Sequence, residues 1–164
     1  MDQPLTDCGK RNTDRAGAIM MGPDSLLREE KMELYTSHWR NEDIAGLDVV
    51  AVGISRGTPR GRLAERLPYR YKRLTDLAPP GELFERWKAG TVSPDEYARA
   101  YHGYLDSLGP DEVTDQLEKK RAEHGGKPLV LVCWCPPGEF CHRRLWANWW
   151  FEKTGQEVPE LPAA

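Results

Sequence analysis

The chain has 164 residues, of which 39% are hydrophobic and 30% charged, and its formal net charge is −3 at pH 7. These values fit one domain of ordinary size and exclude the overall positive field with which many proteins bind duplex nucleic acid. No apolar run approaches the roughly 20 residues that cross a bilayer, and no hydrophobic signal segment opens the sequence, so we expect a cytoplasmic protein without a membrane partner.

Residues 1–30 are predicted to be a flexible or peripheral N-terminal extension, because they are polar and show no sustained hydrophobic period. Residues 31–164 are predicted to form a single domain that binds a ligand. Of the four cysteines, Cys8 falls in the extension and is expected to have no role. The other three lie between positions 133 and 141, and in a reducing compartment they should stay free of disulfides.

Three segments have the composition of strands. Residues 32–39 and 48–54 come first in the chain. Residues 129–132 (Leu-Val-Leu-Val) then form an apolar, partly β-branched run that is typical of a buried parallel sheet. Residues 63–71 are ambiguous between helix and extended chain, and Pro68 favours an extended end to that stretch.

Helices are predicted between and after these strands. The clearest start signal is Ser93, an N-cap that is followed by proline and two acidic residues. Gly155 suits the left-handed residue that ends many helices. The predicted helices span residues 82–88, 94–108, 111–124 and 141–154.

The alternation of strands and helices predicts the α/β class. We expect a single, three-layer, Rossmann-like domain with a mainly parallel sheet of four or five strands. Residues 157–161 are expected to add a short strand or a tail. Ligands in such sheets bind beyond the carboxyl ends of the strands.

Two loops at strand ends carry side chains that suit an anionic ligand. The first, the Arg56 loop, comprises residues 55–60 (Ser-Arg-Gly-Thr-Pro-Arg) and follows Ile54. The second, the Cys-rich loop, comprises residues 135–144 and follows Trp134. It enters a helix whose free N–H groups and dipole favour an anion. Because parallel strands end at the same edge of a sheet, we expect both loops to share one pocket.

The candidate ligand-binding residues come from the ends of three predicted strands. Arginines would hold a phosphate or carboxylate, and Trp39 would stack on a planar ring. The alternatives are a solvated basic loop around Arg56 and ordinary core packing for Trp39. The candidates are Ser37, His38, Trp39, Ser55, Arg56, Thr58, Arg60, Cys135, Cys141, His142 and Arg143.

The Cys-rich loop allows three interpretations. Thiolate and imidazole ligands suit zinc, but adjacent Cys141 and His142 seldom face one ion and no second Cys/His pair has ligand spacing, so we expect neither metal nor cofactor. Cys141 and His142 are instead the catalytic candidates, because a helix N-terminus beside Arg143 would stabilise a thiolate. In the structural alternative Cys133 is a buried strand residue, Cys141 packs, and His142 and Arg143 position a ligand or cap the fold.

The end of the last long strand and the loop after it follow a recurring pattern. Cys133 or Cys135 ends the strand, a Pro-Pro-Gly-Glu-Phe loop follows, and Cys-His-Arg opens a helix at residues 141–143. With Tyr-Thr-Ser at residues 35–37 and Arg56 after the second strand, this resembles the bacterial, archaeal and phage family called domain of unknown function 488. The chain departs from it in having Gly-Ile-Ser before Arg56, where the family more often has Val-Asp-Val. The resemblance covers about residues 32–161 and implies the fold rather than an activity.

We therefore expect the domain to bind an anionic, nucleotide-like small molecule between the Arg56 loop and the Cys-rich loop, and to sense or sequester it. The phage members of the resembled family make a phage protein that captures a host signalling nucleotide one form of this hypothesis. An enzyme that hydrolyses or transfers on a nucleotide, nucleobase or phosphoester through Cys141 or His142 is the first alternative. A protein-interaction module is the second. Single-stranded nucleic acid is a secondary candidate partner, and the sequence does not indicate an oligomeric state.

Overall fold

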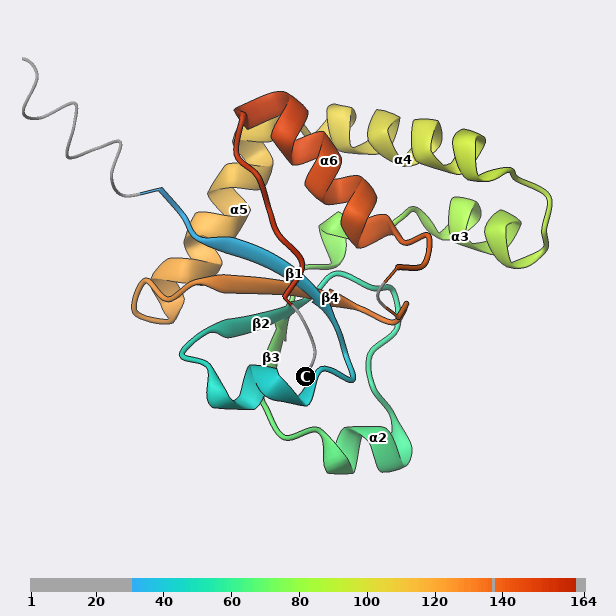
Figure 1. Cartoon of the computed structure of the whole chain (residues 1–164). Helices are drawn as coiled ribbons and strands as arrows, with labels where there is room; N and C mark the ends of the chain where they lie inside the picture. Colours follow the sequence, from blue (N-terminus) through green and yellow to red (C-terminus); the bar gives the residue numbers. More distant parts are fainter. Residues whose placement is uncertain (1–30, 137, 162–164) are drawn as a thin grey trace, which may run out of the picture. The chain divides into compact units, whose positions relative to one another are not determined.

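The computed structural model describes residues 31–136 and 138–161, so the predicted extension of residues 1–30 lies outside the described part of the chain. The described residues form an α/β structure with a parallel sheet, which confirms the predicted fold class (Figure 1). The order across the sheet is β1-β4-β2-β3, so β4 lies between β1 and β2. The strands are β1 (Leu34–His38), β2 (Val50–Gly53), β3 (Tyr71–Arg73) and β4 (Leu129–Cys133).

Helices cover both faces of the sheet. Figure 1 shows α4, α5 and α6 on one side of the strands, and the short η1 helix and α2 on the other. Of these, α6 packs directly on β1, β4 and α4, so the three-layer arrangement has α6 next to the central strand. The helical elements are η1 (Glu42–Gly46), α2 (Gly61–Arg66), η2 (Thr75–Leu77), α3 (Gly81–Lys88), α4 (Pro94–Leu108), α5 (Pro110–Glu123) and α6 (His142–Thr154).

The core is centred on β4, whose residues are all 0% exposed. Successive strand side chains point to opposite faces of a sheet. One face of β4 contributes Val130 and Val132 to a cluster with Trp39, Ile44 and Ala51. The alternation then directs Cys133 to the opposite face, toward α6, which is where the Cys-rich loop enters its helix.

Local signals in the sequence fix the ends of the long helices. The Ser93 hydroxyl accepts a hydrogen bond from the Glu96 amide at 3.2 Å, as expected for an N-cap. Gly155 has a φ of 75° and its amide donates to the Phe151 carbonyl at 2.8 Å, which ends α6. Both capping predictions are therefore confirmed.

The ambiguous stretch of residues 63–71 divides into two elements. Most of α2 lies in its first half, and β3 begins at its last residue and pairs with β2 from Ala51 to Gly53. Tyr71 packs edge-on against Trp39, with ring centroids 4.7 Å apart, whereas the next two side chains of β3 are exposed. Long-range packing of this kind has no signature in a three-residue strand, so the sequence could not place β3.

The C-terminal residues extend the sheet beyond β1. Thr36 forms an isolated parallel bridge with Glu160. Its amide donates to the Pro159 carbonyl at 3.0 Å, and its carbonyl accepts from the Leu161 amide at 2.8 Å. The predicted short strand or tail over residues 157–161 is therefore a bridge of strand type along the edge of β1.

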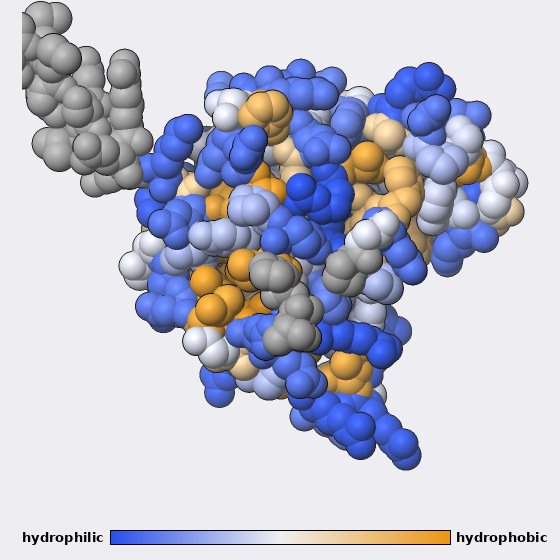
Figure 2. Space-filling model, viewed as in Figure 1, coloured by the Kyte–Doolittle hydropathy of each residue, from blue (hydrophilic) through white to orange (hydrophobic). Residues whose placement is uncertain are grey.

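The surface is largely hydrophilic but has hydrophobic areas, as the face in Figure 2 shows. In the part of the chain that the structure describes, the exposed large hydrophobic side chains are Leu47, Trp134, Phe140 and Phe151. Of these, Trp134 and Phe140 belong to the connection from β4 to α6. Within residues 31–136 and 138–161, no helix has both the length and the apolar character needed to span a bilayer.

Candidate functional site

A pocket of about 510 Å³ lies where the chain leaves β2 and β4. Pockets that hold small molecules typically measure about 300–1,000 Å³, so this cavity is within the size range of a small-molecule site. The structure thus brings the Arg56 loop and the Cys-rich loop to one pocket. Its lining residues are Ser55, Arg56, Gly57, Arg60, Pro79, Phe84, Trp87, Lys88, Tyr97, Trp134, Cys135, Phe140, Cys141 and His142.

One wall of the pocket is aromatic. Phe140 packs against Trp87 of α3 and Tyr97 of α4, with ring centroids 5.0 and 5.6 Å apart. Trp87 and Tyr97 also contact each other at 5.1 Å. On the other side, the Trp134 indole N–H donates to the Gly57 carbonyl at 3.0 Å and so joins the two loops. The rings offer planar apolar surface for stacking.

Basic side chains also line the pocket. Arg56, Arg60 and Lys88 line the pocket with exposed side chains. The Arg56 Nη1 atom donates to the Pro79 carbonyl at 3.0 Å, which orients the guanidinium. Its remaining N–H groups are available for an anionic group, and a guanidinium can bind a phosphate or carboxylate through two parallel hydrogen bonds.

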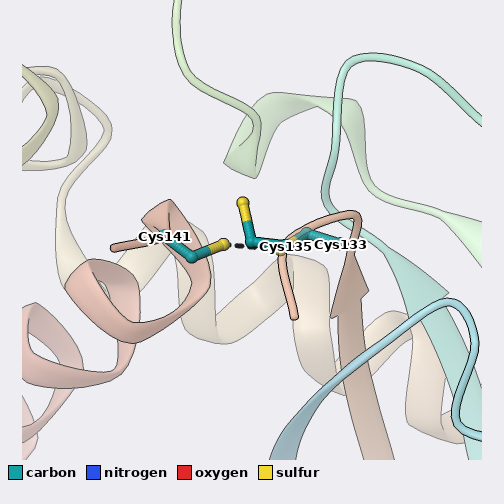
Figure 3. A group of neighbouring side chains, drawn as sticks. All are labelled: Cys133, Cys135 and Cys141. Atoms are coloured by element: carbon teal, nitrogen blue, oxygen red, sulfur yellow. Dashed lines mark hydrogen bonds between the residues drawn. The ribbon is translucent and has the colours of Figure 1, made fainter. Parts of the chain in front are cut away.

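Three cysteine side chains lie close together between the end of β4 and the start of α6 (Figure 3), and two of them line the pocket, so we call the cluster its floor. The sulfurs of Cys133, Cys135 and Cys141 all lie within 4.8 Å of one another, and those of Cys133 and Cys141 are 2.6 Å apart. Cys133 is fully buried, Cys141 is 3% exposed and Cys135 is half-buried. Cys135 and Cys141 line the pocket, whereas Cys133 lies behind them.

The thiols differ in acidity because they share hydrogen bonds. Hydrogen bonds from the Cys135 and Cys141 thiols hold the pKa of Cys133 far below its usual range, although burial opposes this shift. The same interactions raise the pKa of Cys141, and burial raises it further. The cluster by itself therefore favours one thiolate, at Cys133, with the other two sulfurs protonated.

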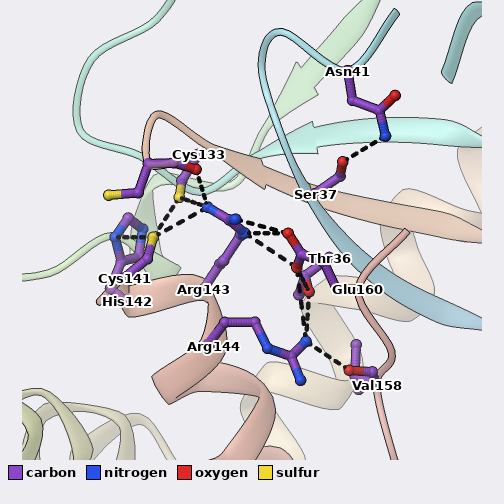
Figure 4. A network of polar contacts seen from close by, with 11 residues as sticks. Thr36, Ser37, Asn41, Cys133, Cys141, His142, Arg143, Arg144, Val158 and Glu160 are labelled. Atoms are coloured by element: carbon purple, nitrogen blue, oxygen red, sulfur yellow. Dashed lines mark hydrogen bonds and ion pairs between the residues drawn. The ribbon is translucent and has the colours of Figure 1, made fainter. Parts of the chain in front are cut away.

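Arg143 lies behind the thiols and is only 1% exposed (Figure 4). Its Nη1 atom donates to the Cys133 sulfur at 3.0 Å, to the Cys141 sulfur at 3.4 Å and to the Cys135 carbonyl at 2.6 Å. Its Nε and Nη2 atoms donate to the Glu160 carboxylate. Burial works to lower the pKa of Arg143, but Glu160 and the Cys133 thiolate together raise it above its usual range. The guanidinium is thus bound by the protein itself.

His142 is held as a neutral imidazole. Its Nε2 atom lies 2.8 Å from the Ile54 carbonyl, and because a carbonyl only accepts, Nε2 carries the proton. Burial lowers the pKa of the ring, with smaller opposing effects from Cys133 and the Ile54 carbonyl. Nδ1 is then an unprotonated acceptor, 4.0 Å from the Cys141 sulfur.

Several predicted site residues lie away from the pocket. The pocket lining does not include five of the predicted residues, which are Ser37, His38, Trp39, Thr58 and Arg143. Trp39 is 0% exposed and its indole N–H donates to the Ser55 hydroxyl at 3.0 Å, so it packs in the core, which was the alternative for this residue. The Ser37 hydroxyl accepts a hydrogen bond from the side-chain Nδ2 atom of Asn41 at 2.9 Å. These residues would have to move to reach a ligand in this pocket.

The pocket residues of α3 were not among the candidates from the sequence. Phe84, Trp87 and Lys88 lie at i, i+3 and i+4 on α3, a spacing that puts them on one helix face. That spacing could have identified them as a set. It could not have shown that the set faces the Cys-rich loop, because α3 is separated from that loop by two further helices and β4.

The fold and the site define an α/β protein with a cysteine-floored pocket at the carboxyl ends of its parallel strands. A family model, DUF488-N3a, described as the active DUF488-N3 subclade, matches residues 34–154. The chain belongs to this family, as its resemblance to domain of unknown function 488 implied. The match includes every strand and all the pocket-lining residues. Neither the curated proteins nor the solved structures gave a match.

Proposed function

We propose that the protein binds an anionic, nucleotide-like small molecule in this pocket. The observation that carries the proposal is the combination of aromatic rings and exposed cations around one cavity of suitable volume. Trp87 and Phe140 offer surfaces on which a base can stack. Arg56, Arg60 and Lys88 offer charge-assisted hydrogen bonds to phosphate or carboxylate oxygens.

Sensing or sequestration of such a molecule is the form of the proposal that we favour. Two of the groups that could serve catalysis, His142 Nε2 and the Arg143 guanidinium, are occupied by hydrogen bonds within the protein. Capture of a signalling nucleotide by a phage-encoded protein is a narrower version. The reduced thiols suit a reducing compartment such as the cytoplasm.

An enzymatic function is the second candidate, because Cys135, Cys141 and His142 line the same pocket. The Cys141 thiol, after giving its proton to His142 Nδ1 at 4.0 Å, could attack an electrophilic carbon or phosphorus of a bound nucleotide, nucleobase or phosphoester and expel the leaving group. Cys141 and His142 were the catalytic candidates from the sequence. The structure adds Cys135, which is the most exposed of the three thiols.

The binding proposal is tested with a panel of nucleotides and calorimetry. Arg56→Ala should weaken binding of the best ligand by about 10- to 100-fold, the equivalent of one lost charged hydrogen-bonding group. Arg99→Ala is the matched control, since Arg99 is exposed on α4 and does not line the pocket. Equal affinities of the two variants, or no binding by any nucleotide, would contradict the proposal.

Chromatography of the ligand after incubation separates binding from turnover. Sequestration returns the ligand unaltered. Conversion of the ligand by the unchanged protein, lost in Cys141→Ser while binding is retained, would establish the enzymatic alternative.

A further inference from the structure

We propose that the sulfurs of Cys133, Cys135 and Cys141 bind one zinc ion at the floor of the pocket, with the fourth coordination position open to the cavity. The three sulfurs lie within 4.8 Å of one another and come from the end of β4, the loop after it and the N-cap of α6. A tetrahedral ion with Zn–S bonds of about 2.3 Å holds its sulfurs about 3.8 Å apart. Small side-chain rotations therefore convert the observed cluster into a ligand set.

The surroundings supply what thiolate ligands need. Three thiolates around a dication carry one net negative charge, and the buried Arg143 guanidinium lies beside two of the sulfurs, at 3.0 and 3.4 Å. Partners that donate to the ligand atoms are typical of metal sites. Glu160 in turn fixes Arg143 in this position. The sulfurs of Cys133 and Cys141 are 2.6 Å apart, and a shared ion would hold them at the sulfur spacing of a tetrahedral site.

The pocket side of the cluster carries the open position. Cys135 and Cys141 line the cavity, whereas Cys133 closes the far side. His142 Nε2 is bonded to the Ile54 carbonyl, so Nδ1, which lies 4.0 Å from the Cys141 sulfur, is the ring nitrogen that faces a water bound there. Catalytic zinc sites keep such an open position, so the metal would give the enzymatic alternative its electrophile. The metal site itself does not depend on nucleotide binding.

The expectation of no metal rested on the adjacency of Cys141 and His142 and on the lack of a second Cys/His pair with ligand spacing. In the structure the sulfur of the buried Cys133 lies beside the other two, so three cysteines form a set in which His142 need not be a ligand. Thiolate sets favour zinc, copper(I) or iron–sulfur clusters. Clusters generally need four thiolates, and a tetrahedral site open to water favours zinc over copper(I).

The test uses the full chain, expressed with added zinc and purified with a reductant but no chelator. Elemental analysis should find about one zinc per chain. Replacement by Co²⁺ should give the thiolate-to-cobalt charge-transfer band and the strong visible bands of a tetrahedral site. Cys135→Ser should lower zinc affinity by more than about 100-fold, beyond the usual effect of losing an outer-shell partner.

Two variants serve as controls. Cys8→Ser changes the remaining cysteine of the chain and should leave affinity and stoichiometry unchanged. His142→Gln should lower affinity by no more than about 100-fold, as for a residue outside the ligand set. Circular dichroism checks that Cys135→Ser folds, and if it does not, the cobalt spectrum of the unchanged protein still decides.

Any one of the following results overturns the proposal. These are zinc far below stoichiometry together with no charge-transfer band, copper in place of zinc, a Cys133–Cys141 disulfide in the reduced preparation, or loss of zinc from the His142→Gln or Cys8→Ser variant. Zinc retained with unchanged affinity in a folded Cys135→Ser variant would equally refute the three-thiolate set. None of these outcomes bears on whether Arg56 binds a nucleotide, so the two proposals fail separately.

Discussion

The Arg143 guanidinium donates to both carboxylate oxygens of Glu160, with N–O distances of 2.7, 3.0 and 3.2 Å. Glu160 also accepts from the Thr36 hydroxyl at 2.5 Å and lies 3.8 Å from Arg144. The pair joins the first turn of α6 to the segment along β1. The Nη1 atom of the same guanidinium donates to the sulfurs of Cys133 and Cys141. Glu160 therefore fixes the position of the Arg143 positive charge next to the thiols.

Glu160→Gln should lower the free energy of unfolding by about 3 kcal/mol, because the buried Arg143 guanidinium loses the carboxylate that pairs with its Nε and Nη2 atoms. Breaking a buried ion pair usually costs about 3–5 kcal/mol, and we expect the lower value because the Glu160 side chain is 24% exposed. Denaturant titration measures the change. Asp48→Asn breaks the exposed Lys127–Asp48 pair and should cost less than about 1 kcal/mol; equal losses would show that Arg143 finds another partner.

Gly53→Ala should destabilise the protein by about 1–3 kcal/mol, the usual cost of overpacking a core. A Cβ atom at Gly53 would lie 2.7 and 2.8 Å from two ring carbons of Trp39, which is fully buried and cannot retreat into solvent. Gly46→Ala is the control, because a Cβ atom at Gly46 would meet nothing within 4 Å, and it should change stability by less than about 0.5 kcal/mol. A thermal shift no larger than that of Gly46→Ala would contradict the tight contact.

Ser55→Ala should cost about 1–3 kcal/mol, the penalty for a buried donor that loses its acceptor. The donor is the indole N–H of Trp39, 3.0 Å from the Ser55 hydroxyl. Ser107→Ala removes an exposed hydroxyl that bonds only within its own helix and is expected to stay within about 0.5 kcal/mol. Chemical denaturation of both variants decides, and an indistinguishable pair would mean that another acceptor reaches the indole.

The Asp106 carboxyl should make the free energy of unfolding depend on pH. Hydrogen bonds from the Trp149 indole and then from Lys153 lower the pKa of its carboxyl. A lowered folded-state pKa stabilises the protein above the unfolded pKa of about 3.9, and this stabilisation is lost as the pH falls through the folded value. Asp106→Asn should therefore be slightly less stable than the parent at pH 7 and equal to it at pH 2. A difference that grows on acidification would contradict this assignment.

The sequence predicted the elements that are marked by a capping residue or by a continuous apolar run. Ser93, Gly155 and the apolar run from Leu129 to Val132 each act through their nearest neighbours, so the pattern alone located α4, the end of α6 and β4. β3 depends on Trp39 and on pairing with β2, so its short sequence carried no signal. An element that is stabilised by contacts distant in the sequence cannot be predicted from the helix or strand propensities of its own residues.

The candidate site was predicted in the same uneven way. Arg56, Cys135, Cys141 and His142 were found because they follow strands, and parallel topology determines where strand ends meet. Arg143 had the same sequence signal, yet its side chain turns toward Glu160, a partner seventeen positions away that no motif links to it. The aromatic wall from α3 and α4 required knowledge of how the helices pack.

The bridge between Thr36 and Glu160 also affects how the protein behaves at high concentration. A free strand edge presents unpaired N–H and C=O groups on which a second molecule can add a strand. Residues 159–161 occupy that position beside β1, and the opposite edge, β3, is three residues long and exposes Lys72 and Arg73. Both borders of the sheet are therefore poor templates for strand addition, and substitutions that release residues 159–161 should first appear as aggregation.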